Sequence, residues 1–483
     1  MEAAIKEKYQ AVIGLEVHIQ LATNSKLFAS DRNQFGDTPN TNISAITLGH
    51  PGTLPKVNRA AIAMAIKMGL ACQSSISQEM IFDRKNYFYP DLPKGYQITQ
   101  DRTPICVGGG IQVMIDGQVH IIDLNRIHLE EDAGKLIHLT DAPQSSVDFN
   151  RAGTPLIEMV TEPVIHKAEE AFQLLMEVRK LVRYLDICDG NMEQGSMRCD
   201  ANVSVRPTAS AELGKKVEVK NLNSMRNVKR AIEYEIERQI RQLEEARPIS
   251  SETRTFVEKD GSTAAIRDKE TLTDYRYFPD PDLGRVLITD QWLEEIKNEL
   301  PQLPWELKEE FMEKYQLTDY DATILTESKS MAQYFQSLCR ISHTTKANAN
   351  WLIGPVRSHL NGLGTTIKHF SVPSTKLAQL ITMVQAKKVS FSVAAQQLLP
   401  QLIKDPEKDP MGLAQEAGVL QKSDPEALSA LVEEVLIDMP EKVKAYKNGK
   451  KGLIGLFMGQ LMKKSNGAID PSLAKELLLK HLD

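Results

Sequence analysis

The chain has 483 residues, enough for two or three domains with a large hydrophobic core. Hydrophobic residues make up 42% and charged residues 25%, as in ordinary soluble globular proteins, and no apolar run is long enough to cross a membrane. The formal net charge of −6 does not, as an average, suggest a protein that binds nucleic acid.

The cysteines and the N-terminal residues indicate the cellular compartment. The five cysteines form no CxxC pair and no even set, which favours a reducing compartment and argues against a zinc site of the cysteine-knuckle type. Residues 1–18 lack the apolar core of a signal peptide and the arginine-rich character of a transit peptide. We therefore expect a cytoplasmic protein.

Up to about residue 297, short strand patterns are mixed with helices. Residues 12–23 alternate strictly between apolar and polar side chains, and residues 197–207 and 215–224 do the same. Strands of this kind belong to antiparallel sheets with one face on a core and one face open. The polar faces carry acids, cations, a histidine and an amide, namely Glu16, His18, Asp200, Asn202, Glu218 and Lys220.

Helix patterns occur in both halves of the chain. Two amphipathic helices are expected at 166–186 and 225–246. Because strands and helices do not alternate regularly, we predict an α+β fold with a large antiparallel sheet rather than a doubly wound sheet. From about residue 300 only helix patterns remain, and the charged, proline-rich segment 404–412 marks a further boundary. Amphipathic helices follow it at 427–437, 440–447, 452–464 and 471–482.

Three consecutive acids follow a histidine in the segment RIHLEEDAGK. In an extended strand, His128, Glu130 and Asp132 share one face, and Glu131 points the other way. Either a β-bulge turns Glu131 inward, or only one of the two glutamates faces a site.

Several acids could converge on one concave sheet, namely the three of this segment, those of the polar-faced strands, and Glu193 in the segment NMEQGS. Oxygen-rich clusters suit hard divalent cations, and magnesium bound in this way commonly bridges to substrate phosphates. The alternative is that the acids are dispersed over the surface, since a region of about 300 residues contains dozens of them.

A second set of candidates is cationic. Residues 81–100 combine Arg84 and Lys85 with several aromatic side chains, in a segment that we interpret as a proline-broken loop. The cations could hold phosphates that carboxylates alone would repel. The aromatic rings could be a platform for a base, although ordinary packing is the favoured interpretation. A turn before a later strand adds Arg151, and residues 272–282 place an arginine among acids and aromatic rings.

Several sequence motifs of catalysis are absent. Without GxxxxGK[ST], a nucleotide would not be held by a P-loop, and the GGG at 108–110 lacks the GxGxxG spacing. No GxSxG, HExxH or Cys/His signature marks a nucleophile or a zinc protease. Any chemistry is therefore expected to be metal-assisted electrostatics rather than covalent catalysis.

Residues 441–464 form a basic segment, with seven lysines against one acid. A patch of this kind can steer a phosphate backbone. The alternative is a solvated, lysine-rich helix.

Together these segments closely resemble the B subunits of the aspartyl/glutamyl-tRNA amidotransferase family. The resemblance rests on GLEVHIQL, FDRKNYFYPDLPKGYQITQ, IHLEEDAGK, DFNRAGTPLIEMVTEP, MRCDANVSVRP, EVKNLNS, DYRYFPDPDL and YKNGKKGLIGLFMGQLMKKSNGAIDPSLAKELL. It covers essentially the whole chain, in the order of the family.

The resemblance implies a catalytic cradle domain at 1–297, similar to the glutamine synthetase/guanido kinase fold. A helical domain at 298–408 and a small all-α, tRNA-binding tail domain at 409–483 would follow. It also implies a heterotrimer with an amidase-type A subunit and a small C subunit. Such a complex is a glutamine-hydrolysing, ATP-dependent carbon–nitrogen ligase that converts Glu-tRNA(Gln) into Gln-tRNA(Gln), and in many bacteria Asp-tRNA(Asn) into Asn-tRNA(Asn).

In this family, the amidase-type subunit releases ammonia, and the B subunits use ATP and magnesium to phosphorylate the side-chain carboxylate before ammonia displaces phosphate. The resemblance makes Glu16, His18, Glu131 and Lys85 the catalytic candidates. The metal candidates are Glu16, His18, Glu130, Glu131, Glu193, Asp200 and Glu218. The phosphate or ATP candidates are Arg84, Lys85, Arg151 and Lys220. The tRNA candidates are Lys447, Lys450, Lys451, Lys463 and Lys464. The zinc-binding cysteine cluster of some relatives is not seen here, so no zinc is expected.

Two other functions remain open from the sequence. The chain could be a non-catalytic, tRNA-binding scaffold of the same complex, whose acids merely order loops. It could also be a metal-dependent hydrolase or nuclease built on the same acids.

Overall fold

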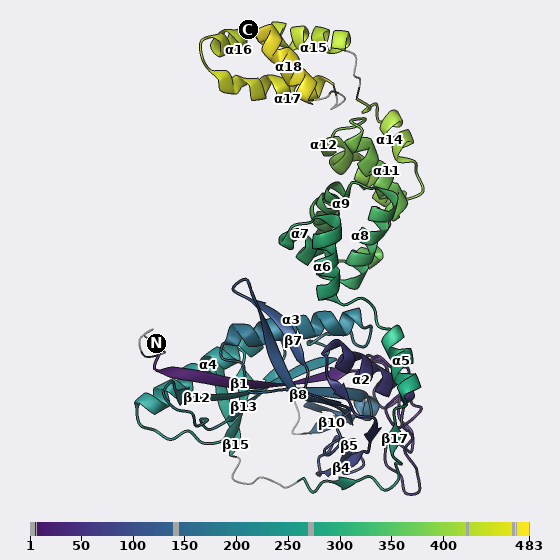
Figure 1. Ribbon diagram of the computed structural model, residues 1–483, viewed down its shortest axis with the longest axis vertical. Coiled ribbons are helices and arrows are strands. Elements are labelled where there is room, and N and C mark those ends of the chain that lie inside the picture. Colours follow the sequence, from purple (N-terminus) through teal and green to yellow (C-terminus); the bar gives the residue numbers. More distant parts are fainter. Residues whose placement is uncertain are drawn as a thin grey trace. The chain divides into compact units, whose positions relative to one another are not determined.

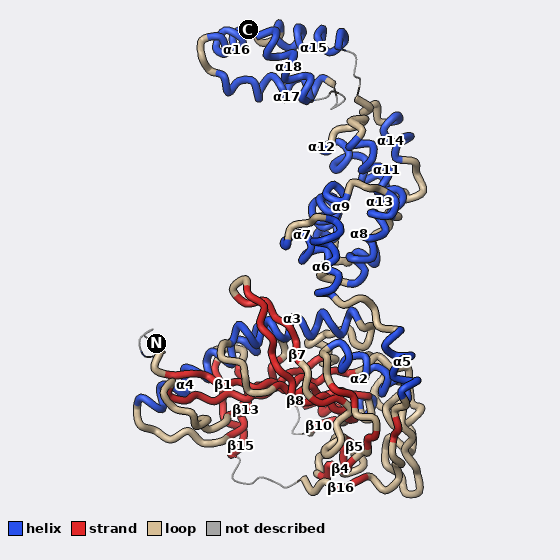
Figure 2. Tube along the Cα trace, in the orientation of Figure 1, coloured by secondary structure: helices blue, strands red, loops and turns tan. Residues whose placement is uncertain are grey.

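The computed structural model describes residues 5, 7–138, 144–268, 275–421, 425–465, 469 and 471–482. The chain divides into two compact units, Met1–Leu303 and Pro304–Asp483 (Figure 1), and each is described by itself. The first unit combines strands and helices, and the second is helical (Figure 2). None of the helices in the described part of the chain has both the length and the apolar character that a membrane crossing requires.

A ten-stranded sheet forms the centre of the first unit. Its strands, in spatial order, are β15 (Ser262–Asp268), β14 (Glu252–Val257), β13 (Val217–Leu222), β12 (Met197–Pro207), β1 (Tyr9–Gln20), β11 (Pro155–Thr161), β8 (Gln118–Glu131), β6 (Cys106–Val107) and β2 (Ser75–Ile76), and β7 (Gly110–Ile115) pairs with β8. The predicted α+β fold is confirmed.

One detail of the sheet differs from the expected antiparallel arrangement, because β13 and β14 pair in parallel. Parallel neighbours need a crossover connection, commonly a helix. Here the helix α4 (Met225–Glu244) lies between the two strands in the sequence. Every other pair in the sheet is antiparallel.

Two amphipathic helices, α3 (Ala168–Tyr184) and α4, cover one face of this sheet (Figure 1). Ser224 caps α4 by accepting a hydrogen bond from the backbone N–H of Asn227. The buried stripe of α4 includes Val228 and Ile232, both without solvent exposure. Since α3 and α4 occupy one face, the polar side chains of β1, β12 and β13 project from the other.

Three smaller sheets belong to the described part of this unit. The segment predicted to be a loop at 81–100 contains two strands, β4 (Asp83–Asn86) and β5 (Tyr96–Thr99), which form a three-stranded sheet with β16 (Phe278–Pro279). The proline-broken loop is confined to the residues between β4 and β5. The remaining elements of this unit are β3 (Glu79–Met80), β17 (Val286–Leu287), β9 (Lys135–His138), β10 (Ser145–Asp148), α2 (Arg59–Ala71), α5 (Asp290–Asn298) and the 3₁₀ turn η1 (Phe149–Arg151).

The second unit is built from short helices. They are α6 (Pro304–Tyr315), α7 (Asp319–Leu325), α8 (Lys329–Ile341), α9 (Thr345–Trp351), η3 (Leu352–Val356), α10 (Arg357–Gly362), η4 (Ile367–His369), α11 (Ser374–Gln385), α12 (Phe391–Val393), η5 (Ala394–Leu398), α13 (Leu399–Lys404), α14 (Pro410–Glu416), α15 (Pro425–Ile437), α16 (Pro440–Lys447), η6 (Lys451–Leu453), α17 (Ile454–Lys464) and α18 (Pro471–Leu482). The last four α-helices agree closely with those predicted near the C-terminus. Their buried faces share a small core that includes Val432, Phe457 and Leu478.

Shortening Ile232 to alanine should destabilise the first unit by about 2–5 kcal/mol, because a buried side chain between α4 and the sheet leaves a cavity. The measurement is urea unfolding followed by circular dichroism. Glu233→Ala, at the exposed neighbouring position of the same helix, is the matched control. Equal effects of the two substitutions would contradict the packing described for α4.

Candidate functional site

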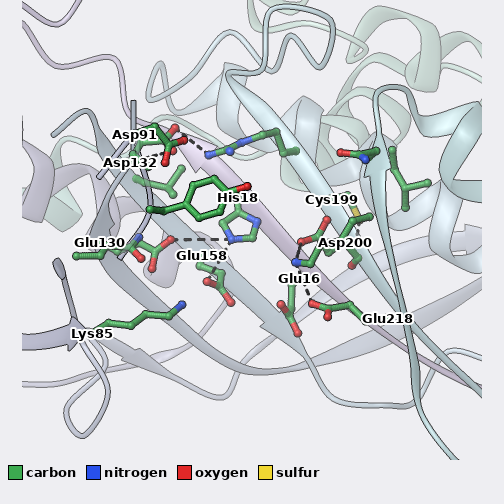
Figure 3. A pocket seen from close by; sticks show the side chains of 18 of the residues that line it. Glu16, His18, Lys85, Asp91, Glu130, Asp132, Glu158, Cys199, Asp200 and Glu218 are labelled. Atoms are coloured by element: carbon green, nitrogen blue, oxygen red, sulfur yellow. Dashed lines mark hydrogen bonds and ion pairs between the residues drawn. The ribbon is translucent and has the colours of Figure 1, made fainter. Parts of the chain in front are cut away.

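The open face of the sheet carries a cavity of about 680 Å³ (Figure 3). Its walls are formed by β1, β8, β11, β12 and β13 and by the loop between β4 and β5. The acids that line it are Glu16, Asp91, Glu130, Asp132, Glu158, Asp200 and Glu218. The lysines and arginines that line it are Lys85, Arg151, Arg198, Lys216 and Lys220.

Strand pairing brings together a first group of three acids. Glu16 on β1 lies opposite Asp200 on β12, and Glu218 on β13 lies opposite Asn202, the next residue of β12 on the same face. One carboxylate oxygen from each acid lies within 4.8 Å of those of the other two. Asn202 donates a hydrogen bond to Glu16 at 2.8 Å. We call Glu16, Asp200 and Glu218 the carboxylate triad.

A β-bulge in β13 places Lys220 among these acids. Between two paired positions, β12 contributes only Asp200 where β13 contributes Lys220 and Asn221, and Asn221 has a φ of +63°. The ammonium group of Lys220 lies 2.8 Å from Asp200 and 2.9 Å from Glu218. Burial lowers the pKa of Lys220, but the two carboxylates outweigh burial and raise it.

A second group lies on the neighbouring strands and consists of His18, Glu130 and Glu158. His18 faces Glu158 across β1 and β11, and its Nε2 is 3.2 Å from Glu158 and 3.9 Å from Glu130. Ligand atoms of these three residues also lie within 4.8 Å of one another. His128 is close to both glutamates, at 3.8 Å from Glu130 and 3.6 Å from Glu158. We call His18, Glu130 and Glu158 the histidine triad.

The charges of the histidine triad shift the protonation of its members. Burial lowers the pKa of His18, but the hydrogen bond and charge of Glu158 raise it above its ordinary value. Burial raises the pKa of Glu158, but His18 and His128 hold it well below its usual range. The pKa of the neighbouring Lys85 is raised like that of His18. Burial lowers it, but the charges of Glu130 and Glu158 outweigh burial.

Two arginines complete the cationic lining. Arg198 lies opposite His18 on β12 and donates a hydrogen bond to Asp132 at 2.8 Å. Its Nε is buried and has no hydrogen-bond partner within the described part of the chain. Arg151 is held by the backbone carbonyl groups of Ala133 and Gly134, and its Nε is 3.8 Å from Asp132.

The cavity contains most of the residues proposed from the sequence. Those that line it are Glu16, His18, Lys85, Glu130, Arg151, Asp200, Glu218 and Lys220. Three others, Glu131, Glu193 and Arg84, do not belong to its lining.

Glu131 is the most informative of these exceptions. β8 pairs with β11 in continuous register from Arg126 to Glu131, so Glu130 faces the cavity and Glu131 faces away. The Glu131 carboxylate forms a buried ion pair with Lys94 and accepts a hydrogen bond from the backbone N–H of Ile98 at 3.0 Å. Of the two glutamates, only Glu130 therefore lines the cavity, and Glu131, which the resemblance made a catalytic and metal candidate, does not.

Glu193 and Arg84 lie outside the lining of the cavity for different reasons. Glu193 is exposed in the turn before β12. Arg84 forms ion pairs with Asp280 at 2.7 Å and Asp282 at 2.9 Å, and its guanidinium group stacks over Tyr96. Its charge is thus balanced by two carboxylates outside the cavity.

Glu158 and Arg198 are two of the charged cavity residues that were not proposed as site residues from the sequence, together with Asp91, Asp132 and Lys216. Arg198 shares a strand face with Asp200, and the strict alternation of that strand could have marked it as a member of the open face. Glu158 lies in the largely apolar strand PLIEMVT, which does not alternate. What the sequence could not show is the pairing that sets Glu158 against His18.

The donor set fits divalent cations. Seven carboxylates against five lysine and arginine side chains leave a formal excess of two negative charges. Both triads offer carboxylate oxygens, with one imidazole, at the spacing that a shared cation needs. Hard cations such as magnesium prefer this kind of ligand.

The lysines proposed to bind tRNA lie in the second unit. Lys447, Lys450, Lys451 and Lys463 are exposed, and Lys451 lies over the ring of Tyr446. Lys464 differs, because it is paired with Glu434 and Asp438 on α15.

Comparison with known proteins identifies relatives of the whole chain. A family model described as the GatB/GatE catalytic domain matches residues 11–294, and a GatB domain model matches residues 333–482. A protein from Synechococcus sp. (strain JA-3-3Ab) is 43% identical, covering 100% of this chain and 99% of its own length. One from Geobacter sulfurreducens is 44% identical, covering 98% and 99%. Both are named as B subunits of aspartyl/glutamyl-tRNA(Asn/Gln) amidotransferase.

Replacing Glu131 with glutamine should lower the free energy of unfolding by about 3–5 kcal/mol, because the charge of Lys94 stays buried without its partner. Glu130→Gln should cost less, since it also removes the repulsion between Glu130 and Glu158. Urea unfolding without divalent cations would measure both. If Glu130→Gln is the more destabilising substitution, the orientation of the two glutamates is wrong.

Proposed function

The chain belongs to the family of aspartyl/glutamyl-tRNA(Asn/Gln) amidotransferase B subunits, and from this premise we propose that its cavity activates a side-chain carboxylate by phosphoryl transfer. The names of the relatives indicate one component of a ligase-type tRNA amidotransferase. The observation that carries the catalytic proposal is the convergence of two triads and Lys85 in one cavity.

The reaction has two steps. An oxygen of the side-chain carboxylate of Glu-tRNA(Gln) or Asp-tRNA(Asn) attacks the γ-phosphorus of ATP, and the bond to ADP breaks. Ammonia then attacks the carbonyl carbon of the mixed anhydride, phosphate leaves, and loss of a proton gives the amide. Phosphoryl transfer depends chiefly on positioning and charge neutralisation, which a cavity lined by acids and cations can provide.

The carboxylate triad and the histidine triad are the residues that would hold magnesium. Bound there, magnesium would neutralise the charge of phosphate oxygens. Lys220 supplies a positive charge to Asp200 and Glu218. We propose that Lys220, held beside these acids, would also bind phosphate oxygens of the substrate.

Lys85 and the arginines supply the charge for phosphate. The ammonium group of Lys85, on β4, lies 4.8 Å from the centre of the Tyr275 ring, and Lys85 lines the cavity. Arg198 lines the cavity, and its hydrogen bond to Asp132 fixes a guanidinium group whose charge would act on substrate oxygens. Such pre-positioned donors stabilise charge that develops during phosphoryl transfer.

Partners follow from the same proposal. An amidase-type A subunit would supply ammonia from glutamine, and a small C subunit would complete the heterotrimer. The second unit would bind the body of the tRNA through its exposed lysines, by contact with the phosphate backbone rather than with bases.

Glu16→Gln should reduce kcat for amide formation about 100- to 1000-fold in the assembled complex, because it removes one charge from the carboxylate triad. Glu193→Gln, at an exposed position outside the cavity, should leave kcat nearly unchanged. Steady-state transamidation assays with saturating ATP and aminoacyl-tRNA would measure both. Full activity of Glu16→Gln with unchanged tRNA binding would instead favour a non-catalytic scaffold.

Lys450→Gln should weaken tRNA binding and reduce the slope of log K against log salt by about 1, as loss of one phosphate contact does. Lys464→Gln should have a smaller effect, because Lys464 is already neutralised by Glu434 and Asp438. Binding of tRNA measured over a series of salt concentrations distinguishes the two variants. Identical slopes in Lys450→Gln and the unmodified chain would refute this contact.

A further inference from the structure

Lys85 differs from other cations of the cavity in what holds its charged group. Lys220 is paired with two acids of the carboxylate triad, and Arg198 donates a hydrogen bond to Asp132. The ammonium group of Lys85 makes no hydrogen bond or ion pair with the described residues, and it lies over the ring of Tyr275, 4.8 Å from the ring centre. The face of an aromatic ring attracts a cation at this distance.

Backbone contacts fix Tyr275 beside the strand that carries Lys85. The backbone N–H of Asn86, the residue after Lys85, donates a hydrogen bond to the carbonyl group of Tyr275 at 2.8 Å. The side-chain amide of Asn86 donates another to the carbonyl group of Arg276 at 2.7 Å. Just beyond, β16 pairs with β4. The ring and the lysine are therefore held on neighbouring, hydrogen-bonded segments.

Two further rings hold the ring of Tyr275. Tyr87 and Tyr277 meet it edge to face, with ring centres 5.9 Å and 6.3 Å away. Contacts of this geometry are favourable between aromatic side chains. Both Tyr87 and Tyr275 line the cavity. The position of the Tyr275 ring is thus set by its backbone and by its neighbours, and not by Lys85 alone.

A contact with a ring leaves the donors of Lys85 unused. Glu130 and Glu158 lie in the same cavity, and their charges act on Lys85 (Figure 3). An ion pair with either acid would use ammonium donors and would occupy an oxygen that we propose to hold a cation. The face of a ring has no acceptor atom of this kind, so the ammonium group keeps its donors for substrate oxygens.

We infer that Tyr275 is a positioning residue, whose ring holds the ammonium group of Lys85 in the cavity, apart from the acids, where it can bind phosphate oxygens. This inference rests on the proposed function, in which Lys85 supplies charge to phosphate. A cation that is already in place needs little rearrangement when charge develops in phosphoryl transfer. In this role Tyr275 acts through Lys85 and not on the substrate itself.

The test changes the charge distribution of the ring and keeps its shape nearly the same. Tyr275→Phe is the reference variant, because it retains the aromatic face and loses only the hydroxyl group. Phenylalanine with one, two or three fluorine atoms would then replace Tyr275 in the full chain, within the assembled complex. Fluorine withdraws electron density from the face of the ring, so each added atom weakens its attraction for a cation.

The value of kcat for amide formation should fall stepwise as fluorine atoms are added. The fall over the series should be roughly 2- to 30-fold, which corresponds to the strength of a cation–π contact. The midpoint of thermal unfolding should stay the same over the series. A ring that only filled space would give no such trend in kcat.

Two further variants separate this inference from the proposed function. Fluorinated phenylalanine at Phe82, whose ring packs against Phe28 outside the cavity lining, should leave kcat unchanged. In Lys85→Met, kcat should fall by more than in any fluorinated variant. If kcat falls in Lys85→Met but stays constant over the series at Tyr275, the inference is wrong and the role of Lys85 stands. Full activity of Lys85→Met would refute both.

Discussion

The balance of charge in one cavity is the constraint on which the first unit depends. Seven carboxylates line this space, and closely spaced like charges repel unless cations are placed among them. Strand pairing provides these cations residue by residue. Lys220 lies between Asp200 and Glu218, and Arg198 is bonded to Asp132. The groups that balance charge in this cavity are thus the same ones that we propose to bind cations and phosphates.

Side chains alternate along a β-strand, so two adjacent residues of β8 have different roles. One lines the cavity, and the other holds the neighbouring hairpin in place. Glu130 faces inward, near His18. Glu131 faces outward and holds Lys94 and the backbone of Ile98. Through these two contacts it fixes both the loop and the second strand of the β4–β5 hairpin, and the first strand of that hairpin carries Lys85 into the cavity. One peptide bond therefore separates a proposed metal ligand from a residue that positions a cation.

Local patterns predicted much of this arrangement, and long-range pairing set the rest. Period-two alternation placed Glu16, Asp200 and Glu218 on open strand faces, because the side chains of a strand alternate whatever its partners are. It could not show which strands are neighbours, so Glu158 was missed. Nor could it show that Asp280, 196 residues away, pairs with Arg84. The parallel pairing of β13 and β14 depends on the crossover through α4 and has no signature within either strand.

Carboxylate activation by phosphoryl transfer is tested most directly by tracing a labelled oxygen atom from the substrate to its product. Glu-tRNA(Gln) labelled with oxygen-18 in its side-chain carboxylate would be converted by the assembled complex with ATP and glutamine, and the released phosphate analysed by mass spectrometry. Activation of the carboxylate by phosphoryl transfer predicts one labelled oxygen in each phosphate, since the bridging oxygen leaves with phosphorus. Unlabelled phosphate released together with the amide would contradict it.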